Sequence, residues 1–489
     1  MPESRKIGLI IFFVLLLSYL FFSQNYKNSN IVSRMSLTLS ILQERTVIIN
    51  KFHEATIDKA YYNGDFYSDK APGIALSSLP ISAVVYNILR IFDPNPVFII
   101  GGNVTNNFGL LVYFSTIITS GLLTACTALA LYFIALHIGA SIPGAVFAMV
   151  SFGLATQAWG WATALFGHAM SSACLFLGFT AIFYSSVLKH DRHKVALLGF
   201  AAGALLAWAI VAEYTAVFAS AIIGVYGLLS LRKCSHTAKF QFFTRASASF
   251  FIFILPLIIY NYIAFGSPFS VGYNYVQSFE GMKEGFLGIT IPDFNTLVRL
   301  IFSPYRGLLW FSPILFLAPI AIYLLLRNHK TKKIVIMIIS LAAYYLLVNS
   351  AYHYWYGGSS TGPRHLTPII PFLCLPLSLV WTNARSTYKP LLVILFFISF
   401  LIALVSVSVT MYSPEKIKNP LFNFLIPGLL NGDVRNMVLI ILRKLNGPFR
   451  SEIFGSSKVG LLSLLPIIFI WTTGYLIVAN RVYKYQNGC

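Results

Sequence analysis

The feature that most constrains this chain is a series of long apolar runs. Six of them are nearly free of charge and close to the length that crosses a bilayer: 7–22, 195–210, 246–262, 334–347, 390–409 and 461–479. A spanning helix needs roughly 20 apolar residues, and every backbone polar group inside lipid must be satisfied. Barrel strands would alternate apolar and polar residues, which these runs do not. The sequence therefore predicts an all-α polytopic membrane protein.

Composition and charge agree with a membrane location. Of the 489 residues, 57% are hydrophobic and only 10% are charged, against roughly 25% charged residues in a soluble domain. The net charge of +20 does not predict nucleic-acid binding, because most basic clusters lie between apolar runs, where cytoplasmic loops carry Lys and Arg. The five cysteines are scattered, which predicts neither disulfides nor metal ligands. No cofactor is indicated, although a divalent metal is left open.

The basic clusters set the orientation of the predicted helices. They are 5–6, 189–194, 232–245, 327–333, 385–389 and 481–484. Placing all of them in the cytoplasm requires an even number of crossings between each pair. The run 74–92 breaks this parity, follows Pro72 and contains Pro80, so we expect an interfacial or re-entrant helix on the outer side. The result is a single transmembrane domain over 1–489, with about twelve spans and both termini inside.

The first apolar run follows Arg5 and Lys6 as in a signal peptide. No small-residue cleavage site follows it, so we expect an uncleaved first helix. The predicted outer loops are 24–106, 266–305, 352–367 and 412–458. A polytopic protein of this kind is expected in the inner (plasma) membrane, with its active face on the periplasmic side.

The acidic residues support this assignment. Of 15 in all, Glu3 and Asp191 alone fall in predicted cytoplasmic segments. Five crowd the first outer loop: Glu44, Glu54, Asp58, Asp65 and Asp69. Solvated charge is the ordinary explanation for any single one, but five acids between two membrane segments indicate a site.

The segment 56–73 of this loop mixes carboxylates, lysines and aromatic rings. Asp58 and Asp69 are the candidate catalytic bases, because a carboxylate can take a proton from a hydroxyl or amine. Lys70 could hold a phosphate as a point charge, and the Tyr67 ring could stack on a sugar. The alternative is a loop held together by Asp–Lys pairs and Tyr packing.

Two local patterns surround these residues. The amphipathic stretch 31–47 predicts a helix lying in the membrane interface. Asn63-Gly64-Asp65 is typical of a turn, where Asp65 has a structural use. The first outer loop is therefore expected to hold juxtamembrane helices and a folded turn.

Two further outer positions carry ionisable side chains. His168 ends the stretch 156–168, either as a hydrogen-bond donor to a substrate or as an interfacial histidine; Trp159 and Trp161 before it fit an aromatic belt. Glu213 closes an apolar helix, and an ionisable group at such depth is a functional hypothesis. The alternative for Glu213 is an ion pair with one of the outer arginines discussed next.

Arginine occurs among Gly and Pro in two outer stretches, at Arg306 and at Arg364. Its planar fork of donors suits phosphate, and His353 and His365 accompany the second arginine. Such groups beside the membrane surface are well placed for a lipid-linked phosphate. Ion pairs with the acids of the first loop are the alternative.

These features resemble the bacterial GT-C-type membrane glycosyltransferases, in particular the protein O-mannosyltransferase-like and aminoarabinose-transferase-like groups. The acid-rich first loop ends in Tyr-Ser-Asp-Lys-Ala-Pro-Gly73, where those groups end in Lys-Pro-Pro-Leu or His-Pro-Pro-Leu. The Gly-Pro-Arg364 stretch is similar to their late outer loop. The resemblance implies a multi-helix bundle that moves a sugar from a polyprenyl-phosphate carrier to a lipid or protein acceptor outside the cytoplasm.

The chain departs from that family in two places. The family has an acid a few positions before an arginine just after the first helix, whereas the matching Arg34 follows Asn-Ile-Val-Ser without an acid. Many members also carry an Asp in the second outer loop, where this chain has His168. The sequence thus predicts a membrane glycosyltransferase; a transporter or flippase, or a polysaccharide ligase of the cell envelope, are the alternatives. Mid-membrane ionisable residues and internal repeats would favour a transporter, and we find no clear repeat.

Overall fold

The structure is a computed structural model that describes residues 2–188, 191–437, 439 and 457–486. Within these residues, helices dominate, and the sheets are two short antiparallel hairpins. Eleven helical stretches are long and apolar enough to cross a membrane, and three shorter apolar helices accompany them. The prediction of an all-α polytopic membrane protein is confirmed.

The helices of the bundle are α1 (Pro2–Phe21), α4 (Asn106–Thr116), α5 (Leu122–His137), α6 (Ile142–Leu154), α8 (Gly167–Val187), α9 (Arg192–Ala212), α10 (Ala216–Ser230), α11 (His236–Phe265), α14 (Ala318–Arg327), α15 (Lys332–Ser350), α16 (Ile370–Cys374), α17 (Leu377–Asn383), α18 (Lys389–Val409) and α22 (Leu465–Gln486). The outer side carries α2 (Ser29–Leu39), α3 (Gly73–Phe92), α7 (Ala158–Ala162), α12 (Phe294–Phe302), α13 (Leu308–Phe311), α19 (Ile426–Leu430) and α21 (Ser457–Leu462), with strands β1 (Lys59–Tyr62), β2 (Asp65–Ser68), β3 (Ile99–Ile100) and β4 (Asn103–Val104). Single 3₁₀ or π turns are η1 (Ser40–Glu44), η2 (His53–Ala55), η3 (Ile117–Gly121), η4 (Leu231–Lys233), η5 (Gly272–Tyr275), η6 (Glu280–Lys283), η7 (Pro313–Leu317), η8 (His329–Thr331), η9 (Arg364–Ile369), η10 (Ser386–Tyr388) and η11 (Leu421–Leu425).

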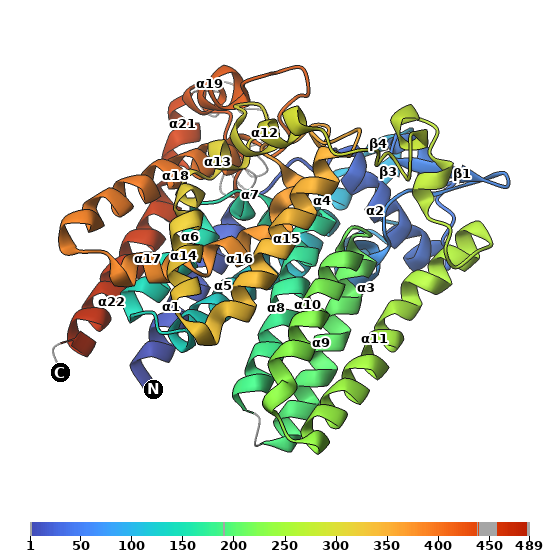
Figure 1. Ribbon diagram of the computed structural model, residues 1–489. Helices are drawn as coiled ribbons and strands as arrows, with labels where there is room; N and C mark the ends of the chain where they lie inside the picture. The colour runs from blue at the N-terminus through green and yellow to red at the C-terminus, as the bar shows by residue number, and fades with distance from the viewer. Residues whose placement is uncertain (1, 189–190, 438, 440–456, 487–489) are drawn as a thin grey trace.

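Both chain ends lie at the same end of the bundle, and the β-hairpins, α12, α13 and α19 lie at the opposite end (Figure 1). Hydrogen bonds fix the directions of neighbouring helices. The Tyr132 hydroxyl near the end of α5 donates to the Ser4 carbonyl near the start of α1, at 3.0 Å. The Tyr113 hydroxyl in α4 donates to the Leu20 carbonyl at the far end of α1, at 2.9 Å. The stretch α4–η3–α5 therefore runs antiparallel to α1, toward the end that holds both termini.

Helix α3 is long enough to span a membrane, but both of its ends lie beside outer segments. Gly73 at its start packs against the backbone of Val211 and Ala212, at the outer end of α9. Soon after its last residue, the β3–β4 hairpin brings Gly102 against the backbone of Glu54 in the first outer loop. This arrangement favours the interfacial or re-entrant helix that the sequence predicts for 74–92.

With α3 set aside, ten long stretches remain, and the short helices Ile142–Leu154 and Pro313–Arg327 complete the up-and-down path. These twelve apolar stretches match in number the spans that the sequence predicts. Of the predicted outer loops, 24–106 holds α2, α3 and both hairpins, and 266–305 holds α12. Residues 440–456 of the loop 412–458 lie outside the described residues, so its acid Glu452 does as well.

The first outer loop is folded differently from the predicted amphipathic stretch 31–47. Helix α2 begins at Ser29, where the Asn28 side chain caps it by accepting from the backbone N–H of Asn30, a favourable N-terminal cap. It ends through η1, after which Arg45 adopts a left-handed backbone with φ of 55°. Every residue from Asn30 to Leu39 is buried. Protein therefore covers α2 on all sides over 30–39, so no face of this part lies in the interface, whereas 41–47 of the predicted stretch is partly or fully exposed.

Candidate active site

The hairpin β1–β2 brings the two candidate bases together. Asn63 and Gly64 adopt positive φ angles of 50° and 93° at the turn, as a tight hairpin turn requires. The register pairs Lys59 with Ser68, so Asp58 and Asp69, one residue further out on each strand, lie side by side at the open end of the hairpin. The turn predicted from Asn-Gly-Asp is thus what places the two carboxylates.

Lys70 bridges these carboxylates. Its Nζ lies 3.2 Å from Asp58 Oδ2 and 2.8 Å from Asp69 Oδ2, and we call these three residues the Lys70 group. All three are buried. Ser33 on α2 donates from its hydroxyl to the other Asp69 oxygen, Oδ1, at 3.3 Å, while the ring of Tyr273 lies 5.6 Å from Nζ. Both carboxylate oxygens of Asp69 thus have partners. Asp58 shares the Lys70 ammonium with Asp69.

Burial and charge act against each other in the Lys70 group. Burial raises the pKa of Asp69, and the neighbouring Lys70 only partly opposes this. Burial alone would lower the pKa of Lys70, but the carboxylates of Asp58 and Asp69 outweigh it and raise that pKa. Lys70 therefore stays charged at neutral pH. One cation between two carboxylates leaves the group with a formal charge of about −1, or near zero when one acid is protonated.

A second ion pair joins α2 to the outer end of α9. Arg34 Nη2 donates to Glu213 Oε1 at 3.0 Å, Nε donates to Asn30 Oδ1 at 2.9 Å, and Nη1 donates to the Ala71 carbonyl at 3.3 Å. The side chain is buried, so these three bonds replace the water that the guanidinium has lost. Burial raises the pKa of Glu213, and the charge of Arg34 opposes the shift. Arg34 thus clamps the first loop to the bundle.

The partner of Glu213 differs from the expected one. We expected an ion pair with Arg306 or Arg364, but Glu213 pairs with Arg34. Its carboxylate also lies 3.6 Å from His168 Nδ1. The sequence did not signal Arg34 as this partner, because 179 residues separate the two and only the fold brings α2 to the end of α9.

His168 and His365 come from different helices and meet at the site. Their ring centroids are 5.0 Å apart at a steep interplanar angle of 80°. The Tyr352 ring lies 5.7 Å from His365 on another side. Next to His365, the Cζ of Arg364 lies 5.2 Å from the centre of the Phe166 ring. The structure therefore gathers the Lys70 group, Glu213, His168, Arg364 and His365 in one place, and the charges of Asp58 and Glu213 act on Arg364.

Three predicted site residues have other partners. Arg306 is fully buried, and its guanidinium donates to the carbonyls of Tyr305, Tyr356, Gly358 and Ser413. His353 pairs with Glu284 at 3.0 Å, with side chains 42% and 57% exposed. Tyr67 packs its ring against Phe265 in an apolar cluster. The structure thus binds Arg306 to backbone, leaves His353 near solvent and places the Tyr67 ring in a core.

The tryptophans of 156–168 do not form an aromatic belt. Trp159 and Trp161 are both fully buried. The Trp159 ring packs on Phe22, Phe400 and Trp471, and the Trp161 ring packs on Phe166, His168 and Tyr412. The prediction of an aromatic belt is therefore wrong, because side chains of other segments cover both tryptophan rings and leave neither facing the membrane surface.

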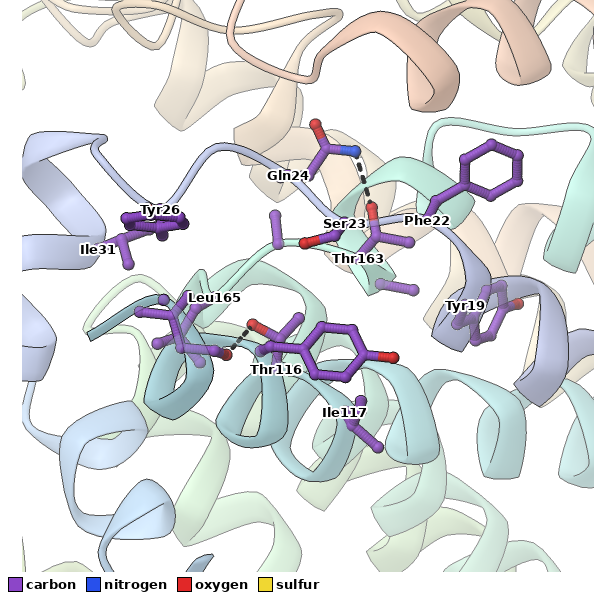
Figure 2. Close-up of a pocket in the computed structure, with 15 residues that line it drawn as sticks. Tyr19, Phe22, Ser23, Gln24, Tyr26, Ile31, Thr116, Ile117, Thr163 and Leu165 are labelled. Carbon is purple, nitrogen blue, oxygen red and sulfur yellow. Dashed lines mark hydrogen bonds between the residues drawn. The ribbon is translucent and has the colours of Figure 1, made fainter. Parts of the chain in front are cut away.

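A recess lies beside the start of α2 (Figure 2). It occupies about 380 Å³, part of which is open to solvent, between the end of α1, the kink η3 and the segment after α7. Its lining includes Tyr19, Gln24, Ile31 and Thr163 and no charged side chain. Gln24 donates to Thr163 across it, at 3.0 Å. Ile31 stands one turn before Arg34 on α2, so the recess adjoins the charged site without an acid of its own.

No group of three or more His, Cys, Asp or Glu side chains in the described ranges is arranged to hold a metal ion. The described cysteines are free thiols.

Comparison with known proteins gives a structural likeness alone. No family model matches the sequence, and no curated protein does. Two crystal structures of ArnT from Cupriavidus metallidurans are similar to the structure over 99% of this chain and 74% of theirs, at 12% identity. The TM-scores are 0.48 for the apo state and 0.47 for the state bound to undecaprenyl phosphate. At this identity the two structures assign no role to any residue of this chain.

Proposed function

We propose that the protein is a membrane glycosyltransferase. It would move a sugar from a polyprenyl-phosphate donor to a lipid, glycan or protein acceptor on the outer, periplasmic face of the inner membrane. The observation that carries this proposal is Arg364, a partly buried cation whose Nε is buried and has no hydrogen-bond partner among the described residues. The charges of Asp58 and Glu213 act on it. A buried guanidinium nitrogen without a partner is costly, and a phosphate oxygen is the partner that suits the arginine fork.

The proposed reaction needs a proton acceptor beside the anion site. The acceptor hydroxyl or amine attacks the anomeric carbon and passes its proton to a carboxylate, while the bond between that carbon and the phosphate oxygen breaks. The electron pair of that bond leaves with the phosphate, which Arg364 holds. Asp58 is the better placed of the two proposed bases, because Asp69 already binds Ser33 and Lys70 through its two oxygens.

The remaining proposed contacts follow from position. His365 follows Arg364 in the chain, and the charge of Lys70 acts on it, so Lys70 and His365 would contact the phosphate or the sugar. His168, held near Glu213, faces His365 and would offer its other ring nitrogen to a substrate hydroxyl. Arg306, His353 and Tyr67 keep a proposed substrate contact only if their present partners are exchanged when a substrate binds.

The placement of charge favours an enzyme over a transporter or flippase. Among the described residues, the buried ion pairs lie at the outer end of the bundle, between Arg34 and Glu213 and within the Lys70 group. A transporter needs its binding groups near the middle of the membrane. A ligase that uses diphosphate-linked donors would employ the same anion site, so donor chemistry separates it from the main proposal.

The test uses purified protein in lipid nanodiscs with a panel of polyprenyl-phosphate sugars and polyprenyl-diphosphate sugars. We expect release of polyprenyl phosphate in the presence of a membrane extract that supplies acceptors, and loss of this release in Arg364→Ala. The matched control is Arg385→Ala, an exposed arginine at the cytoplasmic side. Turnover of diphosphate donors alone would favour the ligase, and lipid movement in liposomes without sugar transfer would contradict the enzyme.

A further inference from the structure

Buried polar atoms without hydrogen-bond partners gather around Arg364. They are Arg364 Nε, His365 Nε2, Trp161 Nε1 and the Tyr412 hydroxyl, each without a partner in the described ranges. We call these four residues the Arg364 group. Two of them, Trp161 and Tyr412, belong to no site that the sequence indicates. Tyr412 follows α18, more than 200 residues after Trp161 on α7.

The Phe166 ring links the members of this group. Its centre lies 5.2 Å from the Trp161 ring and 5.7 Å from the Tyr412 ring, and Arg364 Cζ lies 5.2 Å from it. His168 connects His365 to this group. The centre of the His168 ring lies 5.0 Å from that of His365 and 6.4 Å from that of Trp161. The four unpaired polar atoms therefore belong to side chains that each lie next to the ring of Phe166 or of His168.

The chemistry of the unpaired atoms defines what can satisfy them. Arginine Nε and tryptophan Nε1 can only donate, and the tyrosine hydroxyl donates as well. Buried polar groups are nearly always hydrogen-bonded in native proteins. The missing partner must therefore supply several acceptor oxygens. It is best negatively charged, because Arg364 is a cation. A phosphate group meets both requirements.

We infer that Trp161 and Tyr412 donate hydrogen bonds to the phosphate of the donor lipid together with Arg364. This inference rests on the proposed function, since it names the residues that recognise the same donor. It also orients the donor: the phosphate lies against the Arg364 group, and the sugar points toward the Lys70 group. The two aromatic side chains act as binding residues and take no part in proton transfer.

Two substitutions remove a single donor each while keeping a ring. Tyr412→Phe removes the hydroxyl, and Trp161→Phe removes the indole N–H. Each has a matched control with an unpaired buried donor elsewhere: Tyr345→Phe in α15 and Trp159→Phe, whose ring packs toward α18 and α22. Each control loses the same atom as its partner variant without touching the Arg364 group.

The measurement is the dissociation constant of the full-length protein in nanodiscs for three probes: a polyprenyl monophosphate, the corresponding polyprenol and inorganic phosphate. We expect Tyr412→Phe and Trp161→Phe to weaken polyprenyl-phosphate binding about tenfold each. Polyprenol binding should stay unchanged in both, and both controls should bind all three probes as the wild type does. The melting temperature of unliganded Tyr412→Phe should not fall, because the lost hydroxyl has no partner.

The possible failures are distinguishable. If the wild type binds polyprenyl monophosphate no more tightly than polyprenol, the proposed function fails and the inference falls with it. If the wild type prefers the phosphate but Tyr412→Phe and Trp161→Phe bind it normally, the inference alone is wrong. Inorganic phosphate bound as tightly as the lipid, with the same loss in both variants, would contradict the assignment to a lipid donor. A lower melting temperature of Tyr412→Phe without ligand would show a structural hydroxyl and overturn the inference.

Discussion

The Lys70 group and the Arg364 group lie in one site. The charges of the Lys70 group are paired with one another, whereas Arg364 has a donor without a partner. Lys70 contacts both Asp58 and Asp69, and Ser33 satisfies a further oxygen of Asp69. Arg364 has a ring beneath it and an Nε without a partner. The fold therefore compensates one set of charges internally and leaves the other set open to a ligand. The difference teaches that burial alone does not identify a binding residue, whereas several buried unpartnered donors gathered around one cation indicate a binding site.

The same contrast separates Arg364 from Arg306. Both follow Gly- and Pro-rich outer sequence, and both were predicted to bind phosphate. The guanidinium of Arg306 donates hydrogen bonds to four backbone carbonyls, and burial lowers its pKa to about 10. It therefore fixes the outer loops to one another, and the open guanidinium is that of Arg364.

The largest expected effect breaks the Lys70 side of the comparison. Asp58→Asn keeps the shape of the side chain but cannot take a proton, so we expect turnover to fall by roughly 10²–10⁴-fold. Donor binding should survive, because the phosphate is held by the other group. Single-turnover transfer and the dissociation constant of the donor, measured on the same preparation, check both parts.

Asp69→Asn is the companion variant. Asp69 holds Lys70 and Ser33, so we expect a loss of stability, seen as a lower melting temperature, together with any loss of turnover. Near-normal turnover in both variants would place the base elsewhere, with Glu213 as the next candidate, or would contradict the enzyme.

The second effect concerns the Arg364 side. Arg364→Lys keeps the charge but loses the planar fork and the Nε donor. We expect the donor KM to rise roughly 10–100-fold, as for lost hydrogen bonds to a charged group, with a smaller change in kcat. Arg306→Lys is the contrasting variant, which should lower the melting temperature and leave the donor KM closer to the wild-type value. An unchanged KM in Arg364→Lys would contradict phosphate binding at this residue.

Several parts of this site could be predicted from the sequence, and the reason is local. The Asn-Gly turn and the spacing of Asp58 and Asp69 around it are encoded within twelve residues, so both acids were found before their partner was seen. The basic clusters and parity predicted about twelve spans, which agrees with the apolar helices of the structure, and marked 74–92 as the exception. Local charge patterns of this kind survive folding because the bilayer and the hairpin each impose one geometry.

The rest depended on contacts between distant segments. The sequence around Arg34 does not indicate its ion pair with Glu213, and the sequence around Tyr412 does not indicate its contact with Trp161. Only helix packing brings these residues together. The burial of Trp159 and Trp161 was not predicted for the same reason. The sequence of an apolar aromatic stretch at a helix end is the same whether lipid or another part of the protein covers it. Asn30 could have been found, because it stands four residues before Arg34 on one helix face.

The third effect is a shift of the pH profile. Burial raises the pKa of Asp69, and Lys70 opposes that shift. Asp69 should therefore begin to hold a proton above the ordinary aspartate value of about 3.9, and kcat/KM should fall as pH decreases through that raised pKa. Lys70→Met removes the charge that lowers the pKa, so its acid limb should move to higher pH. A limb that stays in place, measured from the shape of the profile, would separate these acids from catalysis.

The smallest expected effect marks the edge of the site. His353 was predicted to bind substrate, but it pairs with Glu284 in a bridge whose side chains are 42% and 57% exposed. Exposed pairs contribute little, about 0–1 kcal/mol, and water replaces the lost partner. We therefore expect His353→Ala to change kcat and the donor KM by less than about twofold. His365→Ala, which removes a partly buried ring with a buried Nε2 between His168 and Tyr352, should raise the donor KM well beyond that. Equal effects of the two variants would mean that the site extends outward to His353 and that burial does not set its boundary.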